Sequence, residues 1–244
     1  MTGHIATLIS DPAERKRRRQ AKRDQVLRWL RLNTWSSADV LRQVAEQGSR
    51  QAAHTLLEGL CRDGLIRKGI IAAEFGSPVL IWGITAHGAA MAARENEPVA
   101  ARTFEPSKVS ASTLSHSLDV QLMQLKAERA GWKWQPIFGE FSRSEAKYAD
   151  AVGMRPDGQK VAIELERTVK TVKRYAEILI AHLAARKDNK WEWIYYLSPD
   201  EVTCDRVRRA FQEISRARWR GRIIAIDDAH RAPFRFFSYN GNWI

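Results

Sequence analysis

The chain has 244 residues and a formal net charge of +12, so it is long enough for one large or two small domains and basic enough to favour a polyanionic partner. Its two cysteines, Cys61 and Cys204, lie far apart, which argues against a disulfide framework or a cysteine-based zinc site and favours a reducing cytoplasm. No apolar run approaches the roughly 20 residues that span a bilayer, and the N-terminus lacks a signal-peptide pattern, so we expect a soluble cytoplasmic protein without membrane insertion.

The first 95 residues are expected to form a basic arm, residues 1–23, and a small DNA-binding domain, residues 24–95. The arm contains the run DPAERKRRRQAKR, which would steer nucleic acid. Apolar residues at helical spacing then predict three helices, the second capped by Ser36 or Ser37 and the third starting near Ser49, followed by strands at 70–73 and 79–84. This order is typical of a winged helix-turn-helix, in which the third helix enters the major groove and the ribbon touches the DNA backbone.

On that model, polar and basic side chains of the third helix and the wing contact double-stranded DNA. The residues expected at this interface are Ser49, Arg50, Gln51, His54, Thr55, Arg67 and Lys68. The alternatives are that these side chains only face solvent, or that the domain mediates dimer contacts.

Residues 96–112 are polar, include two prolines and lack periodicity, which predicts a linker to a second domain at residues 113–244. The second domain is expected to be α/β, with a mixed central sheet and helices on its faces. Its expected elements are a helix at 114–129, short strands at 132–137 and 139–143, a hairpin at 148–166, a helix from Thr168 to about Arg186, a strand at 190–197, a helix at 202–219, a strand at 222–226 and an irregular tail or edge strand at 233–244. The helix at 202–219 would carry an exposed basic stripe of Arg206, Arg208, Arg209, Arg216 and Arg218.

The hairpin carries the candidate chemistry. The period of two in a strand places Glu164 and Glu166 on one face, and Asp150 on the neighbouring strand reaches the same face. Converging carboxylates repel one another unless a cation or a raised pKa relieves them, and hard oxygen ligands suit Mg²⁺ or Mn²⁺. We therefore predict a metal site, with Lys170 and Lys173 on the following helix holding a water or a phosphate.

Two other interpretations of this region remain open. Both glutamates would be structural if they faced solvent at a sheet edge and paired with Lys160 or Arg167. Tyr175 is a candidate nucleophile for attack on a phosphate, although no activating base is evident beside it.

These residues resemble the PD-(D/E)xK nuclease superfamily. Asp150 stands where the first acid of that pattern lies, and Glu164-Leu165-Glu166 stands where (D/E)-x-K lies, so that Glu166 occupies the lysine position. The resemblance implies a catalytic site of Asp150, Glu164 and Glu166, with Lys170 or Lys173 supplying the lysine from the following helix.

More closely, the chain resembles the replication-relaxation family, which includes the MobC-type relaxases of mobilisable plasmids. The resemblance extends from about Asp24 to about Ile226 and includes the winged helix, the pattern Leu114-x-His116-x-Leu118, and residues 163–168 before a helix that carries lysine and tyrosine. It implies metal-dependent nicking of one strand at a plasmid origin of transfer, with Asp150, Glu164 and Glu166 as ligands of Mg²⁺ or Mn²⁺ and with other mobilisation or coupling proteins as partners.

Two further classes of function compete with a nuclease. A nuclease-like domain that has lost its lysine can persist in a non-catalytic accessory or replication-control protein that binds an origin. A transcriptional regulator with a ligand-sensing second domain is the third hypothesis. The pair Glu164 and Glu166 argues against the regulator, because two adjacent carboxylates buried without a cation would cost several kcal/mol.

Overall fold

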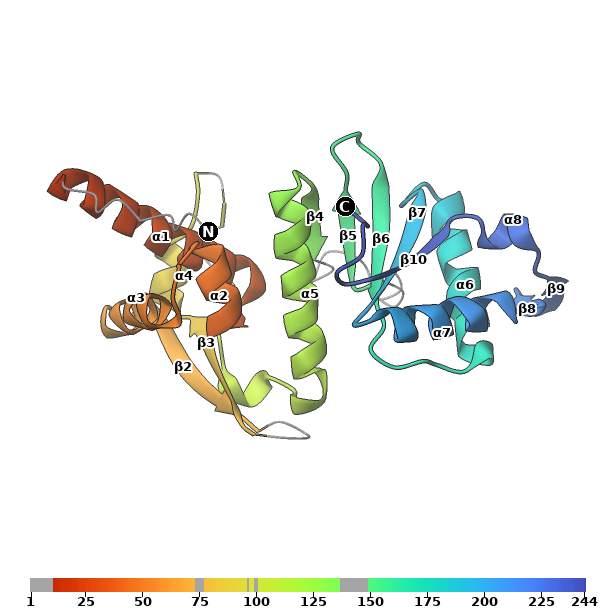
Figure 1. Ribbon diagram of the computed structural model, residues 1–244, viewed down its shortest axis with the longest axis horizontal. Helices are drawn as coiled ribbons and strands as arrows, with labels where there is room; N and C mark the ends of the chain where they lie inside the picture. Colours follow the sequence, from red (N-terminus) through yellow and green to blue (C-terminus); the bar gives the residue numbers. More distant parts are fainter. Residues whose placement is uncertain (1–10, 73–76, 96, 99–100, 137–148) are drawn as a thin grey trace, which may run out of the picture. The chain divides into compact units, whose positions relative to one another are not determined.

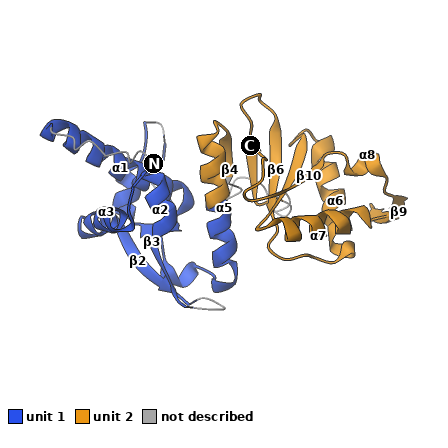
Figure 2. Cartoon of the chain, viewed as in Figure 1, with its two compact units in different colours: residues 1–121 blue, residues 122–244 orange. Residues whose placement is uncertain are grey.

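The computed structural model describes residues 11–72, 77–95, 97–98, 101–136 and 149–244, and the chain divides into two compact units, residues 1–121 and 122–244 (Figure 2). The fold is mixed α/β, as the sequence predicts. The strand expected at 139–143 and the first residue of the expected hairpin, Tyr148, lie outside the described residues. Within the described part of the chain, no helix combines the length and the apolar character needed to cross a membrane.

Unit 1 combines helices with a three-stranded antiparallel sheet in the order β1-β3-β2 (Figure 1). Its elements are α1 (Pro12–Asn33), β1 (Trp35–Ser37), α2 (Ala38–Val44), α3 (Arg50–Arg62), β2 (Ile66–Ile71), β3 (Val79–Ile84), α4 (Ala86–Met91), the 3-10 helix η1 (Pro106–Lys108) and the beginning of α5 (Ala111–Arg129). Side-chain oxygens of Ser37, Ser49 and Thr85 accept backbone N–H bonds and so define the starts of α2, α3 and α4. The strand expected at 70–73 instead begins at Ile66, because β2 pairs along the whole of β3.

The basic run forms the first half of α1. Asp11 caps the helix, and Glu14 forms ion pairs with Arg17 and Arg18 on its exposed first turns. The second half of α1 buries Val26, Leu27, Trp29 and Leu30 in unit 1. One continuous helix therefore joins the charged segment to the core.

Residues 101–112, predicted as part of a linker, pack on the sheet of unit 1. Phe104 is fully buried, and its backbone N–H donates to the carbonyl of Ile84 at 2.9 Å. Its ring lies against Gly69 and Gly83, where an added Cβ would come within 2.7 and 2.0 Å of ring atoms. The ring of Phe104 thus occupies the space that a side chain at position 83 would need, which explains the glycine there.

Unit 2 is built on a five-stranded mixed sheet in the order β10-β7-β6-β5-β4. Strands β10, β7 and β6 run parallel, and β5 and β4 are antiparallel to their neighbours. The elements after α5 are β4 (Lys133–Pro136), β5 (Ala151–Met154), β6 (Lys160–Leu165), α6 (Val172–Lys187), β7 (Trp193–Ser198), α7 (Glu201–Gln212), β8 (Arg216–Trp219), β9 (Arg222–Ala225), α8 (Asp228–Arg231) and β10 (Phe234–Ser238). The C-terminal aromatic segment is therefore an edge strand.

Helices α6 and α7 cover one face of this sheet (Figure 1). Tyr175 of α6 and Phe211 of α7 pack with ring centroids 5.0 Å apart, and Tyr196 of β7 lies 4.9 Å from Phe211. Ala162 of β6 belongs to the same buried cluster. Because side chains alternate along a strand, Glu164, two residues beyond Ala162, faces the same covered side.

Two predicted helix boundaries in unit 2 are wrong. The helix expected from Thr168 begins at Val172, where the Thr171 hydroxyl accepts the N–H of Arg174, so Lys170 precedes the helix. The helix expected to reach Trp219 ends at Gln212. The residues after it form a separate two-stranded ribbon, β8–β9, whose base is closed by a hydrogen bond from the N–H of Ile226 to the carbonyl of Ser215. The predicted basic stripe is thereby divided between α7 and this ribbon.

Candidate functional site

The carboxylates singled out in the sequence meet where β6 ends. Asp150 precedes β5, and its Oδ2 accepts the backbone N–H of Leu165 at 2.7 Å, while its own N–H donates to the carbonyl of Ile163 at 2.9 Å. These two bonds fix Asp150 across the β5–β6 pair. The side chain is thus held beside the strand that carries Glu164.

Glu164 faces α6 and contacts a buried histidine. Its Oε1 lies 3.1 Å from Nε2 of His182, whose side chain is fully buried on α6. Burial lowers the pKa of His182 to about 3, so the imidazole is neutral at physiological pH. Burial, followed by the charge of Asp150, raises the pKa of Glu164 well above its usual value, and Glu166 adds to this effect.

Glu166 is buried and paired with a lysine. The residue is only 3% exposed, its N–H donates to the Leu197 carbonyl at 2.9 Å, and its carboxylate contacts Nζ of Lys170. The backbone N–H of Lys170 donates to the hydroxyl of Tyr175 at 3.1 Å, which holds the segment between β6 and α6 close to the acids. The interpretation of Glu164 and Glu166 as exposed edge residues is therefore wrong.

The two candidate lysines differ in position. Lys170 lies close enough to the acids that its charge lowers the pKa of Glu164, which opposes the effects of burial and of Asp150. Lys173, in the first turn of α6, is exposed and has neither a hydrogen bond nor an ion pair with any described residue. The structure thus brings Lys170, and not Lys173, to the carboxylates.

Tyr175 does not fit the role of a nucleophile. Its side chain is fully buried, and burial raises the pKa of its phenol, which weakens it as an attacking group. Its hydroxyl instead accepts the N–H of Lys170. Tyr175 is a positioning residue for the segment that carries the lysine.

The donor atoms suit a hard divalent cation, but their present arrangement does not form a coordination site. Asp150, Glu164 and Glu166 act on one another electrostatically, as the raised pKa of Glu164 records. Across the part of the chain that the structure describes, no three His, Cys, Asp or Glu side chains are grouped to hold a metal ion. Glu164 already has a partner in His182, and Glu166 has one in Lys170.

Sequence reasoning did not assign His182 or Tyr196 to this site. Tyr196 is opposite Glu164 in the β6–β7 register, and its buried hydroxyl has no partner among the described residues. A usable signal was present for His182, because Tyr175, Ile178 and His182 recur at helical spacing and so share the covered face of α6. A histidine on the covered face of α6 lies over the sheet residues that point towards this helix, among them Glu164 of β6.

The predicted DNA-binding residues of α3 are mostly exposed. Ser49 caps the helix, and the side chain of Arg50 is 84% exposed, with Asp39 at 3.4 Å. Gln51 and Thr55 are exposed on the following turn, where the Thr55 hydroxyl donates to the carbonyl of Gln51. The first turns of α3 thus present solvent-exposed polar side chains.

The other predicted contacts are engaged within unit 1. Lys68 pairs with Glu58 at 2.6 Å and lies 5.4 Å from the ring of Trp82, and His54 packs edge-on against the same ring. Arg67 lies over the ring of Phe104 at 5.6 Å. These side chains remain partly accessible, but each has a partner within the unit.

Comparisons with known proteins give no relative: no protein-family model, no curated protein and no solved structure matches the chain. The functional inference therefore depends on the acidic site of unit 2 and the polar face of α3.

Proposed function

We propose that this protein is a DNA-binding, metal-dependent endonuclease that nicks one strand at a plasmid origin of transfer. In this proposal, unit 1 docks on DNA as a winged helix and unit 2 cleaves with a PD-(D/E)xK-like site. The observation that supports it most is the convergence of Asp150, Glu164 and Glu166 with the ammonium of Lys170 at the end of β6.

The residues divide into two roles in the proposed reaction. Asp150, Glu164 and Glu166 would hold Mg²⁺ or Mn²⁺, and the cation would supply an activated water and neutralise charge on the phosphate. Lys170 replaces the lysine that the motif lacks at position 166 and would hold the scissile phosphate. Its side chain is 38% exposed, so it can turn from Glu166 towards a bound phosphate, while Tyr175 keeps its backbone in place.

A supercoiled-plasmid nicking assay with Mg²⁺ or Mn²⁺ tests the site. We expect the wild type to relax plasmid that carries the cognate origin, and Glu164→Ala to lose roughly 10²- to 10³-fold in rate, the loss that follows removal of a group that stabilises the transition state. Lys173→Ala is the matched control, because this exposed lysine touches none of the carboxylates. Unchanged relaxation by Glu164→Ala would refute the assignment.

One observation favours a second function, that of a non-catalytic origin-binding accessory or replication-control protein. The contact between Glu166 and Lys170 satisfies both charges without a cation, and the described residues contain no preformed metal group. The same assay separates the two functions. Absence of nicking by a wild-type protein that still binds its origin would favour the accessory protein.

Docking through α3 makes a separate prediction. We expect Arg50→Gln to weaken binding to the cognate origin by about 1–3 kcal/mol, or roughly 5- to 150-fold, and to reduce discrimination against random DNA. Arg62→Gln removes the same charge from the last turn of α3 and serves as the control. Competition titrations with origin and random duplexes measure both effects, and equal losses in the two variants would argue against α3 as the reading helix.

A further inference from the structure

The ribbon β8–β9 is a short two-stranded projection with a tight turn. Arg216 pairs with Ala225 and Trp219 with Arg222, so the turn consists of Arg220 and Gly221. Both turn residues have positive φ, 47° and 82°. This geometry suits a two-residue hairpin turn whose twist matches that of the flanking strands.

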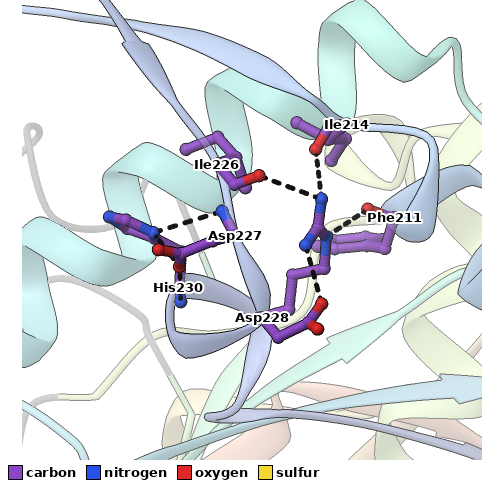
Figure 3. A network of polar contacts seen from close by, with 7 residues as sticks. Phe211, Ile214, Ile226, Asp227, Asp228 and His230 are labelled. Atoms are coloured by element: carbon purple, nitrogen blue, oxygen red, sulfur yellow. Dashed lines mark hydrogen bonds and ion pairs between the residues drawn. The ribbon is translucent and has the colours of Figure 1, made fainter.

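Arg231 connects the base of the ribbon to its surroundings, and Figure 3 shows its partners Phe211, Ile214, Ile226 and Asp228. Its guanidinium donates to the carbonyls of Phe211, Ile214 and Ile226 at 3.2, 2.5 and 3.2 Å and pairs with Asp228 at 3.0 Å. These carbonyls lie at the end of α7 and at both ends of the ribbon. Arg231 therefore joins the ribbon to the body of unit 2.

One face of the ribbon packs inward and the other faces solvent. Ala217 is buried in the core of unit 2, which α6 also lines. Alternation along the strands then turns Arg216 and Arg218 outward. Ile223 is directly opposite Arg218 in the register and is 68% exposed.

Four exposed arginines of the ribbon are unpaired, in contrast to Arg231. Arg216, Arg218, Arg220 and Arg222 have no hydrogen-bond, ion-pair or ring partner among the described residues. Elsewhere in unit 2, Arg174 and Arg208 pair with a neighbouring acid, whereas Arg206 on α7 is exposed without such a pair. Four guanidinium groups without a nearby acid, within ten residues, make a strongly positive surface that would attract an anion.

We propose that the β8–β9 ribbon is a further DNA-contact surface that binds the phosphates of duplex DNA through Arg216, Arg218, Arg220 and Arg222. Guanidinium groups bind phosphate in bidentate geometry, and a two-stranded ribbon fits the major groove. The exposed apolar side chain beside them, Ile223, is aliphatic and suits contact with sugars or base edges. The ring of Trp219 is half-buried on the opposite face with Ala217, so the face that carries Arg216 and Arg218 lacks the aromatic ring on which single-stranded DNA stacks. This surface goes beyond the proposed function, because it requires neither α3 nor cleavage.

An anionic membrane is the competing partner for a basic surface. Stable membrane association needs a broad apolar face beneath the charges, and the outward side of the ribbon offers one large exposed apolar side chain, Ile223. Charge and shape together therefore favour DNA.

The test compares two double variants of the full chain, each of which removes two positive charges. Arg216→Gln/Arg218→Gln changes the ribbon, and Arg206→Gln/Lys187→Gln changes two exposed, unpaired residues on α7 and α6. Binding to a random-sequence duplex is measured by fluorescence anisotropy without divalent metal, from 50 to 200 mM salt.

We expect the ribbon variant to lose affinity on the order of tenfold at 0.1 M salt and its slope of log K against log salt to fall by about 1.8, which is about 0.9 for each lost phosphate contact. In the control variant, Arg206→Gln/Lys187→Gln, the slope of log K against log salt should stay within about 0.5 of the wild-type slope. Binding to anionic vesicles is measured in parallel. Equal losses of DNA affinity in the two variants, or wild-type DNA affinity in the ribbon variant, would overturn the proposal. So would a ribbon variant that loses binding to the vesicles but not to the duplex. Thermal unfolding and circular dichroism establish that both variants fold.

The outcome is separable from that of the nicking assay. A wild type that fails to nick leaves the ribbon result intact, since binding is measured without metal. A chain that nicks normally but binds equally well without Arg216 and Arg218 refutes the ribbon surface alone.

Discussion

Phe104→Ala is expected to destabilise unit 1 by about 3–5 kcal/mol and to remove origin binding at temperatures where the wild type binds. The phenyl ring is fully buried against Ile71, Ile81 and Leu114, so its truncation leaves a cavity that the sheet cannot close. Loss of the ring also uncovers the glycine positions on β2 and β3 against which it packs. A residue in a stretch that reads as a linker would thus control the stability of unit 1.

Hydrogen exchange followed by mass spectrometry locates the effect within the chain. Peptides from β3 should exchange faster by roughly two to three orders of magnitude, since each 1.4 kcal/mol changes an equilibrium tenfold. Peptides from β6, in unit 2, should keep their protection. Ile70→Ala, at a position on β2 that is 72% exposed, is the control and is expected to change stability by less than about 0.5 kcal/mol. Unchanged exchange in Phe104→Ala would show that the segment around it is dispensable.

Glu164→Gln is expected to stabilise the protein above neutral pH by about 1–3 kcal/mol while it abolishes metal-dependent nicking. Glutamine keeps the size of the side chain and a donor and acceptor for Nε2 of His182, but it cannot ionise. The folded-state pKa of Glu164 is raised, so the native protein retains a proton that the unfolded chain releases above about pH 4.5. The free energy of unfolding of the wild type therefore falls as the pH rises from about 4.5 towards the raised pKa of Glu164. The variant has no carboxyl group at this position, so its free energy of unfolding does not show this decrease.

Urea unfolding at pH 4.5 and pH 7.5 measures the difference. The stability gain of Glu164→Gln should be small at the lower pH and largest at the higher pH. His182 contributes in the opposite direction, because its folded pKa is lowered to about 3 and stability is lost as pH falls from about 6.5 towards that value. Burial, the cause of the lowered pKa of His182, is present in both proteins, so this contribution is largely common to them. Glu177→Gln, an exposed residue paired with Arg174, controls for loss of one negative charge, and a gain independent of pH would contradict the prediction.

Local sequence signals predicted many of the element boundaries. The side chains of Ser37, Ser49 and Asp200 cap helices where the sequence places their starts, because a cap depends on a residue and the two or three that follow it. The strand Val79–Ile84 has its predicted bounds. The turn before Lys160 closes as expected, with Gly158 at φ 88° and its N–H donating to the carbonyl of Arg155.

The sequence predicted which carboxylates lie together, but not which side chains contact them. Alternation along β6 placed Glu164 and Glu166 on one face, and their burial in the structure is consistent with that pattern. Which side chains meet them depends on how α6 crosses the strand, and no local rule specifies the contact of Glu164 with His182.

The sequence alone determined the α/β class, most helix starts and the two strands beside which the acids lie, because these features arise from periodicity and turn chemistry within a few residues. Only the tertiary structure decided that Phe104 enters the core of unit 1, that Lys170 returns to Glu166, and that a strand ribbon replaces the last turns of a predicted helix. For Phe104 and for the ribbon the stabilising partners lie far along the chain, in the glycines of β2 and β3 and in the guanidinium of Arg231. Lys170 is held by nearer residues, Glu166 four positions before it and the buried Tyr175 five positions after it. Contacts of this kind form when the chain folds and outweigh the local preference.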